Sequence, residues 1–244
     1  MPLAIDLFCG LGGWTEGLLA EGYDVIGFDI EQHEYGQHRY PAQLIVQDVL
    51  TLHGSQFRDA ALIVASPPCQ EYSYMAMPWK LAKAKAAAIR ADTTGAALER
   101  LNRLFNSCFR LQFEASKAAG RAIPLIVENV RGAQPWVGQA RWSFGSFYLW
   151  GDVPALMPIT LKTHKVPGFR FDGSGKSFQS ASVAHTTGRK VGKDWFGGYG
   201  GGFGWDCSPM RRNSSKSKAR KQASAVIAKI PLPLSRHIAA TFRP

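Results

Sequence analysis

The sequence predicts an α/β fold: a Rossmann-like, doubly wound and mostly parallel sheet with a small loop-rich lobe appended. Three observations support this prediction. Short apolar segments alternate with amphipathic ones over residues 1–150, a glycine-rich turn follows the first apolar segment, and polar residues recur just after the later ones. In such a sheet the carboxyl ends of the strands meet at one edge, so we expect these polar residues to form a ligand site.

The predicted elements follow one another in a regular order. Apolar runs predict strands at residues 2–8, 23–30, 42–49, 61–67 and 123–130. Residues 13–22 predict a helix of about two turns, and the Ala- and Lys-rich stretch 76–120 is predicted helical, most clearly over 101–115. The segment 223–242 predicts a final helix, started by Pro231 and Pro233.

Length and composition indicate one main domain with a smaller lobe. The 244 residues divide into a catalytic unit at 1–150, a lobe at 151–222 and a C-terminal helix at 223–244 that packs back on the first unit. The lobe is rich in Gly, Ser and Lys, and either a loop-rich lobe or a partly disordered arm fits this composition. With no long apolar run and four widely spaced cysteines, we expect a cytoplasmic protein with no disulfides, metal or membrane span.

The net charge of +11 is concentrated in the second part of the chain. Residues 156–244 hold 16 Lys and Arg against 3 acidic residues, whereas residues 1–155 hold 13 against 15. Aromatic residues that can stack on bases, Trp195 and Trp205 among them, lie between these cations. This pattern favours nucleic acid as the partner over the two alternatives, a solvated basic surface and a tail for anionic membranes.

The ends of the first three predicted strands favour an adenosine-containing cofactor. Gly10, Gly12 and Gly13 let the backbone approach a ligand closely, although their spacing is not the dinucleotide pattern. Asp29 after the second strand can hold ribose hydroxyls, and Asp48 after the third is a further acceptor at the same edge. Each acid taken alone could equally be a helix N-cap.

Six motifs carry a resemblance to a known family: DLFCGLGG, FDIE, QDV, SPPCQEYS, IVENV and, more faintly, GQARWSFGSF. Over residues 5–147 the sequence resembles the cytosine-C5 DNA methyltransferases, as a short phage- or prophage-like member. It departs from the family at Glu71 and Tyr72, where a small residue and Phe are common, and at Ser143, where the family has a second Arg. Ala228 and Lys229 stand where a Gly-Asn pair would precede the last helix.

The resemblance implies a class I methyltransferase that uses S-adenosyl-L-methionine. It implies Cys69 as the nucleophile that adds to carbon 6 of cytosine, Glu128 as the group that holds the base and supplies a proton, and Arg141 as the contact to its O2. The implied cofactor residues are Phe8, Gly10, Leu11, Gly12, Gly13, Asp29, Ile30, Asp48, Val49 and Pro67. Cys9 and Cys108 are expected to be packing residues.

The implied partner is double-stranded DNA, methylated by a monomer as in restriction–modification systems, with residues 75–94 as a lid over a flipped base. The expected nucleic-acid contacts are Gln70, Ser73, Trp79, Trp195, Trp205, Arg211, Arg212, Lys216 and Lys218. Three alternatives stay open: a tRNA-directed relative, a non-catalytic nucleic-acid-binding protein on the same fold, and a modified S-adenosylmethionine as the donor.

Overall fold

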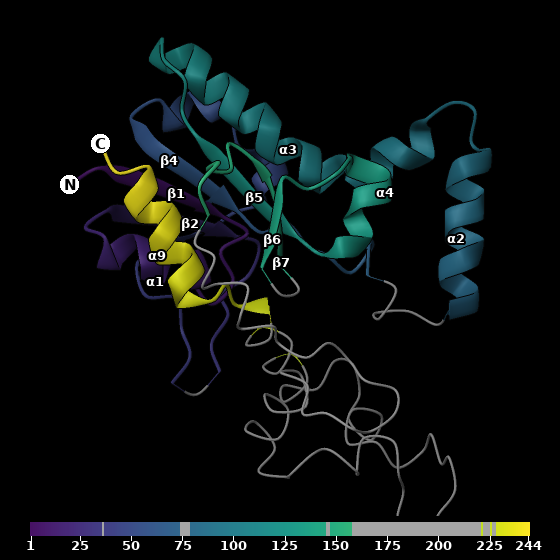
Figure 1. The fold of residues 1–244 in the computed structure, drawn as a ribbon, viewed down its shortest axis with the longest axis horizontal. Coiled ribbons are helices and arrows are strands. Elements are labelled where there is room, and N and C mark those ends of the chain that lie inside the picture. The colour runs from purple at the N-terminus through teal and green to yellow at the C-terminus, as the bar shows by residue number, and fades with distance from the viewer. Residues whose placement is uncertain (36, 74–78, 145–146, 158–220, 222–224, 226–227) are drawn as a thin grey trace, which may run out of the picture.

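The computed structural model describes residues 1–35, 37–73, 79–144, 147–157, 221, 225 and 228–244. In this part of the chain the strands form one seven-stranded sheet of order β3-β2-β1-β4-β5-β7-β6 (Figure 1). The strands are β1 (Leu3–Leu7), β2 (Asp24–Asp29), β3 (Gln43–Val46), β4 (Ala60–Ala65), β5 (Leu125–Asn129), β6 (Trp142–Phe144) and β7 (Phe147–Gly151).

The helices of the described residues fall between and after these strands. The α-helices are α1 (Gly13–Ala20), α2 (Trp79–Ala91), α3 (Ala96–Ala119), α4 (Gln134–Val137) and α9 (Leu232–Thr241). Three short 3-10 helices lie at η1 (Val49–Thr51), η2 (Gly54–Phe57) and η3 (Arg131–Ala133). α9 begins directly after Pro231, as the sequence predicted, because a proline in the first turn lacks only a donor that the helix does not use.

The predicted α/β fold with a mostly parallel sheet is confirmed. β3, β2, β1, β4 and β5 are parallel to one another. At the β5 edge the sheet continues with β7 and β6, which pair antiparallel. This hairpin was not among the predicted strands. The division at residues 150 and 222 stays a prediction, because most of the proposed lobe lies outside the described residues.

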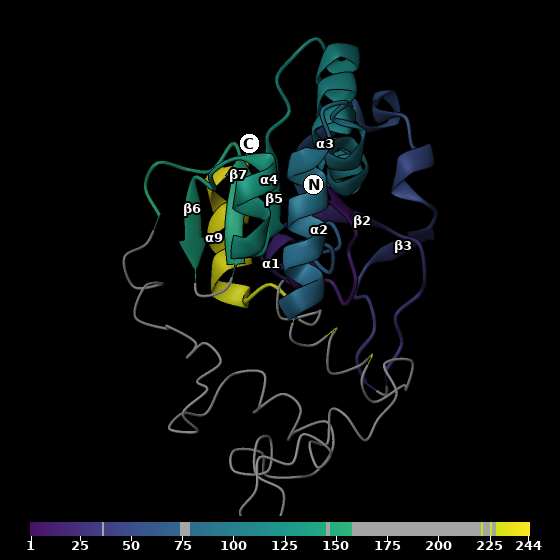
Figure 2. The ribbon, with the colours of Figure 1, turned by 90° about the vertical axis from the view of Figure 1, so that its right-hand side faces the viewer.

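Two apolar layers cover the sheet. One cluster packs β-strand side chains such as Ile63 and Trp150 against Phe105, Cys108 and Leu111 of α3. The other packs α1 and α9 against the opposite face, with Trp14 and Leu234 among its members. Figure 2 shows α3 and α9 on opposite sides of β5 and β7. Because both faces are buried, the central strands read as nearly continuous apolar runs.

Two glycines allow α9 and the segment that precedes it to lie directly against α1. A Cβ on Gly13 would lie 2.3 Å from the backbone nitrogen of Ile230, and one on Gly17 would lie 2.3 Å from Oγ of Ser235. The Tyr23 hydroxyl then donates to the carbonyl of Ala239 over 3.1 Å. The last helix is therefore part of the layer that supports the glycine-rich loop.

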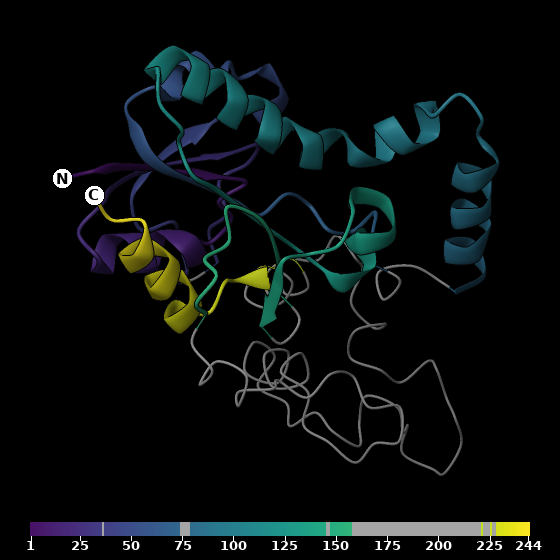
Figure 3. The same cartoon turned by 45° about the horizontal axis from the view of Figure 1, so that its top comes forward.

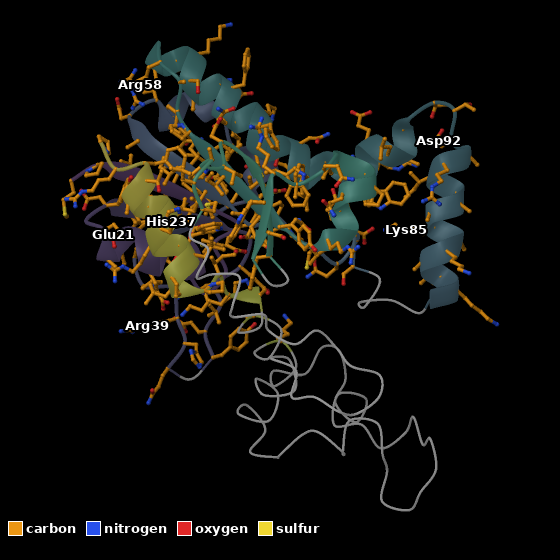
Figure 4. All side chains as sticks on the ribbon, in the orientation of Figure 1. Glu21, Arg39, Arg58, Lys85, Asp92 and His237 are labelled. Atoms are coloured by element: carbon orange, nitrogen blue, oxygen red, sulfur yellow. The ribbon has the colours of Figure 1, made fainter. Side chains whose placement is uncertain are left out.

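α2 is the outlying element of the described chain. It projects from the end of α3 on the side remote from β2 and β3, and a turn at Asp92 joins the two helices (Figures 3 and 4). Ala82 and Ala86 are its buried residues, whereas Lys80 and Leu81 are exposed. Among the helices that the structure describes, none is long and apolar enough to cross a membrane.

Candidate functional site

The glycine-rich loop leaves β1 in a left-handed conformation and enters α1. Phe8 has φ of 57°, Gly10 of 51° and Gly12 of 76°, and the N–H of Gly12 donates to the carbonyl of Cys9 over 2.8 Å. A Cβ on Gly10 would meet nothing within 4 Å, so the backbone there borders open space. The loop therefore has room for a ligand at Gly10.

The other two glycines of this loop face protein atoms. A Cβ on Gly12 would lie 2.5 Å from Cδ of Pro41, and Gly13 faces Ile230 as described above. Leu11 is buried, and Phe8 is half-buried. Of the three glycines predicted to bind the cofactor, Gly10 borders open space, whereas Gly12 and Gly13 allow close packing of the chain.

Asp29 joins the end of β2 to this loop. Its Oδ2 accepts from the N–H of Gly10 over 2.9 Å and its Oδ1 from the N–H of Ile30 over 2.8 Å, while Nε2 of His33 lies 3.6 Å from Oδ1. Burial alone would raise the pKa of Asp29, but the hydrogen bonds from His33 and Gly10 outweigh it and hold the pKa below its usual value. The carboxylate is therefore charged at neutral pH.

The end of β3 presents a second polar group at the same sheet edge. Oδ1 of Asp48 accepts from the N–H of Leu50 over 2.9 Å, so this side chain caps η1, which is the alternative role considered for that acid. Val49, the next residue, is buried, with 2% of its surface exposed. The side chain of Ile30 is instead 70% exposed beside Asp29 and offers an apolar surface.

Cys69 lies in a tight turn after β4. The backbone N–H groups of Tyr72 and Ser73 both donate to the carbonyl of Cys69, over 3.0 and 2.9 Å. Before it, Pro67 is buried and its carbonyl accepts from the Asn129 side-chain amide over 2.9 Å. The turn that carries the thiol is thus held on both sides.

Glu128 lies at the carboxyl end of β5 and reaches toward the Cys69 turn. Its side chain is 8% exposed and hydrogen-bonded to Ser66, whose Oγ in turn accepts from the indole N–H of Trp14 over 3.0 Å. Burial raises the pKa of Glu128 to about 8. Burial and the neighbouring Glu128 together raise the pKa of the Cys69 thiol to about 11. The structure therefore brings the predicted nucleophile and the predicted acid together, both protonated at neutral pH.

Arg141 lies across β7 from the end of β5, and its predicted contact with the base O2 stays a prediction. It precedes β6, and its backbone N–H donates to the carbonyl of Leu149 over 2.9 Å. With Phe109, Leu125 and Asp152 it lines a surface depression, and the Leu149 that its backbone bonds is also the residue that pairs with Glu128 in the sheet. Ser143, in place of the family's second arginine, is exposed.

The predicted nucleic-acid contacts divide into two groups. Gln70 is exposed and Ser73 half-buried in the Cys69 turn, and Trp79 begins α2, with its side chain outside the described residues. The remainder lie outside the described part of the chain altogether: Trp195, Trp205, Arg211, Arg212, Lys216 and Lys218.

Lys229, one of the two residues that replace the family's Gly-Asn pair, forms an ion pair with α1. Nζ of Lys229 lies 2.5 Å from Oε1 of Glu16, so this lysine ties the residues before α9 to α1. Nearby, Arg236 pairs with Glu21 over 2.7 Å. Cys9 and Cys108 are buried, as expected of packing residues. In the described residues, no group of three or more His, Cys, Asp or Glu side chains is arranged to hold a metal ion.

Residues 3–86 match the model of the C-5 cytosine-specific DNA methylases. This match confirms the resemblance to that family for the segment that includes the glycine-rich loop, Asp29, Asp48 and Cys69. Glu128 and Arg141 lie beyond the matched residues. Among curated proteins, the comparison found none that matches the chain.

Several solved structures are similar to the described fold. A protein described as a DNA modification methyltransferase from a prophage of E. coli is 24% identical, with a TM-score of 0.36, and the match covers 55% of this chain and 33% of that one. The S. pombe Dnmt2 methyltransferase is 15% identical, with a TM-score of 0.33, and the match covers 55% of this chain and 35% of that one. The Entamoeba histolytica methyltransferase EhMeth is 17% identical, with a TM-score of 0.33, and the match covers 57% of this chain and 41% of that one. The chain thus spans about a third of the first two.

Several residues of the site were not predicted from the sequence. Ser66 and Trp14 support Glu128, and His33 pairs with Asp29. A buried chain also links Asp6, whose Oδ2 accepts from Thr15 over 2.6 Å, to the hydroxyl of Tyr40, which lies 2.7 Å from Thr15. In the sequence, Trp14 directly follows Gly13 and Ser66 directly precedes Pro67. This position beside predicted site residues was the one feature of the sequence that could have indicated their role.

Proposed function

We propose that this protein methylates carbon 5 of cytosine in DNA, with S-adenosyl-L-methionine as the methyl donor and Cys69 as a covalent nucleophile. The observation that carries the proposal is the meeting of Cys69 and Glu128 at two strand ends, beside the glycine-rich loop and Asp29. The family match over residues 3–86 supports the same chemistry.

The residues at the loop fit the donor. Gly10 borders open space, and Oδ2 of Asp29 accepts one backbone hydrogen bond and keeps a lone pair for a ribose hydroxyl. The exposed Ile30 side chain offers an apolar face for an adenine ring, while Asp48 offers a polar group at the next strand end. When bound, the donor supplies an electrophilic methyl group.

Cys69 overcomes the low nucleophilicity of cytosine carbon 5. Its thiolate forms a bond to carbon 6, which makes carbon 5 electron-rich enough to take the methyl group. Carbon 5 takes the methyl group, which releases the demethylated donor. The proton on carbon 5 then passes to solvent, the carbon–sulfur bond breaks as N3 returns its proton to Glu128, and methylated cytosine and the free thiolate are released. Because the pKa of the free thiol is about 11, the thiolate must form as the substrate binds.

Glu128 supplies the proton that the addition requires. With a pKa of about 8, its carboxyl group is mostly protonated at neutral pH and can donate to N3 of the ring as carbon 6 is attacked. Ser66 and Trp14 hold the carboxyl group in place. A neutral Glu128 also avoids placing a second negative charge beside the thiolate.

The excess of cations in residues 156–244 supports a nucleic-acid substrate. A cytosine in a duplex must leave the stack to reach Cys69, which costs a few kcal/mol. We take duplex DNA as the substrate because the matched family model is that of DNA methylases.

Expression in a host that lacks cytosine methylation tests this function. We expect 5-methylcytosine in the host DNA at a recurrent short motif, detected by sequencing for modified cytosines, and none with a Cys69→Ser variant. Purified protein is then assayed side by side on duplex DNA and tRNA with labelled S-adenosyl-L-methionine. Label in tRNA alone would contradict the DNA assignment, and label in neither, with folded protein, would contradict the activity.

A further inference from the structure

The turn that carries Cys69 is fastened to α3 through a side-chain hydroxyl. Tyr72 is 4% exposed, and its hydroxyl lies 2.9 Å from Oδ1 of Asn102 and 3.2 Å from the carbonyl of Leu101. The backbone N–H of the same Tyr72 donates to the carbonyl of Cys69. One residue therefore connects the backbone of the nucleophile to a long helix of the core.

Both ends of the Asn102 side chain are used. This residue is 6% exposed; its Oδ1 accepts from Tyr72, and its Nδ2 donates to the carbonyl of Trp136 in α4 over 2.8 Å. A buried amide with both groups paired has one favoured orientation, because any rotation would leave a polar atom without a partner. Asn102 therefore holds the Tyr72 hydroxyl at a defined position.

The neighbouring contacts join α2 to the same place. Glu71, next to Tyr72 in the turn, pairs with Lys85, which lies on the side of α2 that faces α4 (Figure 4). The guanidinium of Arg90 lies 5.3 Å from the centre of the Trp136 ring. These pairs are exposed and contribute little, so the buried Tyr72–Asn102 bond is the main constraint on the turn.

We propose that Tyr72 and Asn102 are positioning residues that hold the Cys69 thiol at the angle needed to attack carbon 6, an inference that rests on the proposed function. Removing the hydroxyl leaves Oδ1 of Asn102 buried and unpaired, so the turn gains alternative conformations. Where the family commonly has phenylalanine, this chain uses a hydroxyl to connect the turn to the core.

Alkylation of Cys69 by iodoacetamide at pH 8.5, followed by peptide mass mapping, measures the turn without DNA or cofactor. We expect Tyr72→Phe to alkylate Cys69 about fivefold faster, because opening of the turn becomes easier by one hydrogen bond. Cys108, buried in α3, reports global unfolding, and the rise in its alkylation rate measures how much of the change at Cys69 comes from lost global stability. We expect Cys69 to remain alkylated much faster than Cys108 in the variant, because the opening is local to the turn. In methylation assays with DNA, Tyr72→Phe should lower kcat about tenfold and change KM for DNA by no more than about twofold. The substitution alters the orientation of the Cys69 thiol and leaves the contacts that bind the duplex intact.

Tyr23→Phe is the matched control, because it also removes a buried hydroxyl bond, the one to the carbonyl of Ala239 in α9. It should leave the Cys69 alkylation rate unchanged. Asn102→Ala removes the bond to Trp136 as well as the one to Tyr72, so its rise in the Cys69 alkylation rate should equal or exceed that of Tyr72→Phe. Adding Tyr72→Phe to Asn102→Ala should raise the rate little further, because the bond that the two residues share is already lost.

Parent-like alkylation of Cys69 in Tyr72→Phe would overturn the proposal, as would additive effects of the two substitutions. If the parent protein shows no methyl transfer, the proposed function fails. The alkylation comparison still decides whether Tyr72 and Asn102 hold the turn.

Discussion

The carboxylate of Asp29 accepts a hydrogen bond of 2.9 Å from the backbone N–H of Gly10, 19 residues earlier in the chain. This bond joins the carboxyl ends of β1 and β2, the edge where a doubly wound sheet binds its ligands. Asp29 therefore has two tasks in the proposed site: it shapes the glycine-rich loop and offers an acceptor for ribose hydroxyls.

Replacing Asp29 by alanine should weaken binding of S-adenosyl-L-methionine by about 2–3 kcal/mol, because the variant lacks a charge-assisted acceptor and no longer holds Gly10. DNA binding should change little. Calorimetric titration measures the first quantity, and a duplex-binding assay the second. Asp59→Ala, which removes an exposed carboxylate at the start of β4, is the control. Unchanged cofactor affinity in the Asp29 variant would place the ribose elsewhere.

The pH dependence of kcat/KM should reveal the ionisation of Glu128 and Cys69. Activity needs neutral Glu128 and ionised Cys69, so kcat/KM should rise tenfold per pH unit up to about 8 and then level off. Above pH 8, the protonated fraction of Glu128 falls as fast as the thiolate fraction rises. In Glu128→Gln, which cannot ionise, the levelling at pH 8 should vanish although the rate is lower. The exposed Glu99→Gln should keep it. A break at pH 8 in both variants would assign it to another group.

Asp6 should make the protein less stable as pH rises. It is fully buried, with Oδ1 unpaired among the described residues, and burial raises its pKa to about 7. Between about pH 4 and 7 the folded protein keeps a proton that the unfolded chain releases. The free energy of unfolding therefore falls by about 1.4 kcal/mol per pH unit from this group.

Asp6→Asn should flatten this slope, measured by urea unfolding at several pH values, and Asp59→Asn should not. A slope equal to the parent's in the Asp6 variant would show that Asp6 ionises normally.

The basic segment should determine the salt dependence of DNA binding. Neutralising Arg211, Arg212, Lys216 and Lys218 to Gln should reduce the log–log slope of affinity against salt by about 0.9 for each phosphate that is no longer neutralised. Trp195→Ala should lower affinity or target discrimination with little change in slope, because stacking releases no counterions. Binding of a target duplex across a salt series separates the two effects. If the four-charge variant keeps the parent slope, this segment does not face DNA.

Local sequence patterns were sufficient to predict the parallel part of the fold. The apolar runs that became β1, β2, β4 and β5 are buried on both faces, so they stand out without knowledge of the partners. Cys69 follows β4 and Glu128 lies at the carboxyl end of β5, and parallel strands end at one edge. Their proximity therefore follows from the topology alone.

Other features depend on contacts distant in sequence. The β6–β7 hairpin was missed, because its strands are short and are defined by their pairing with each other and with β5. The role of Arg141, which precedes this hairpin, was inferred from the family resemblance and stays a prediction. Gly12 and Gly13 could not be distinguished from Gly10, because what separates them is contact with Pro41 and Ile230.

A covalent complex between Cys69 and DNA tests the central claim most directly. The parent protein is incubated with S-adenosyl-L-methionine and a duplex that carries 5-fluorocytosine in the target motif found by sequencing. The fluorine blocks the final elimination, so we predict a protein–DNA species that survives denaturation and maps to the Cys69 peptide. Cys69→Ser should give none, and Cys108→Ala should give the parent yield. Methylation of ordinary DNA without any trapped species, or a trapped species at another residue, would contradict Cys69 as the nucleophile.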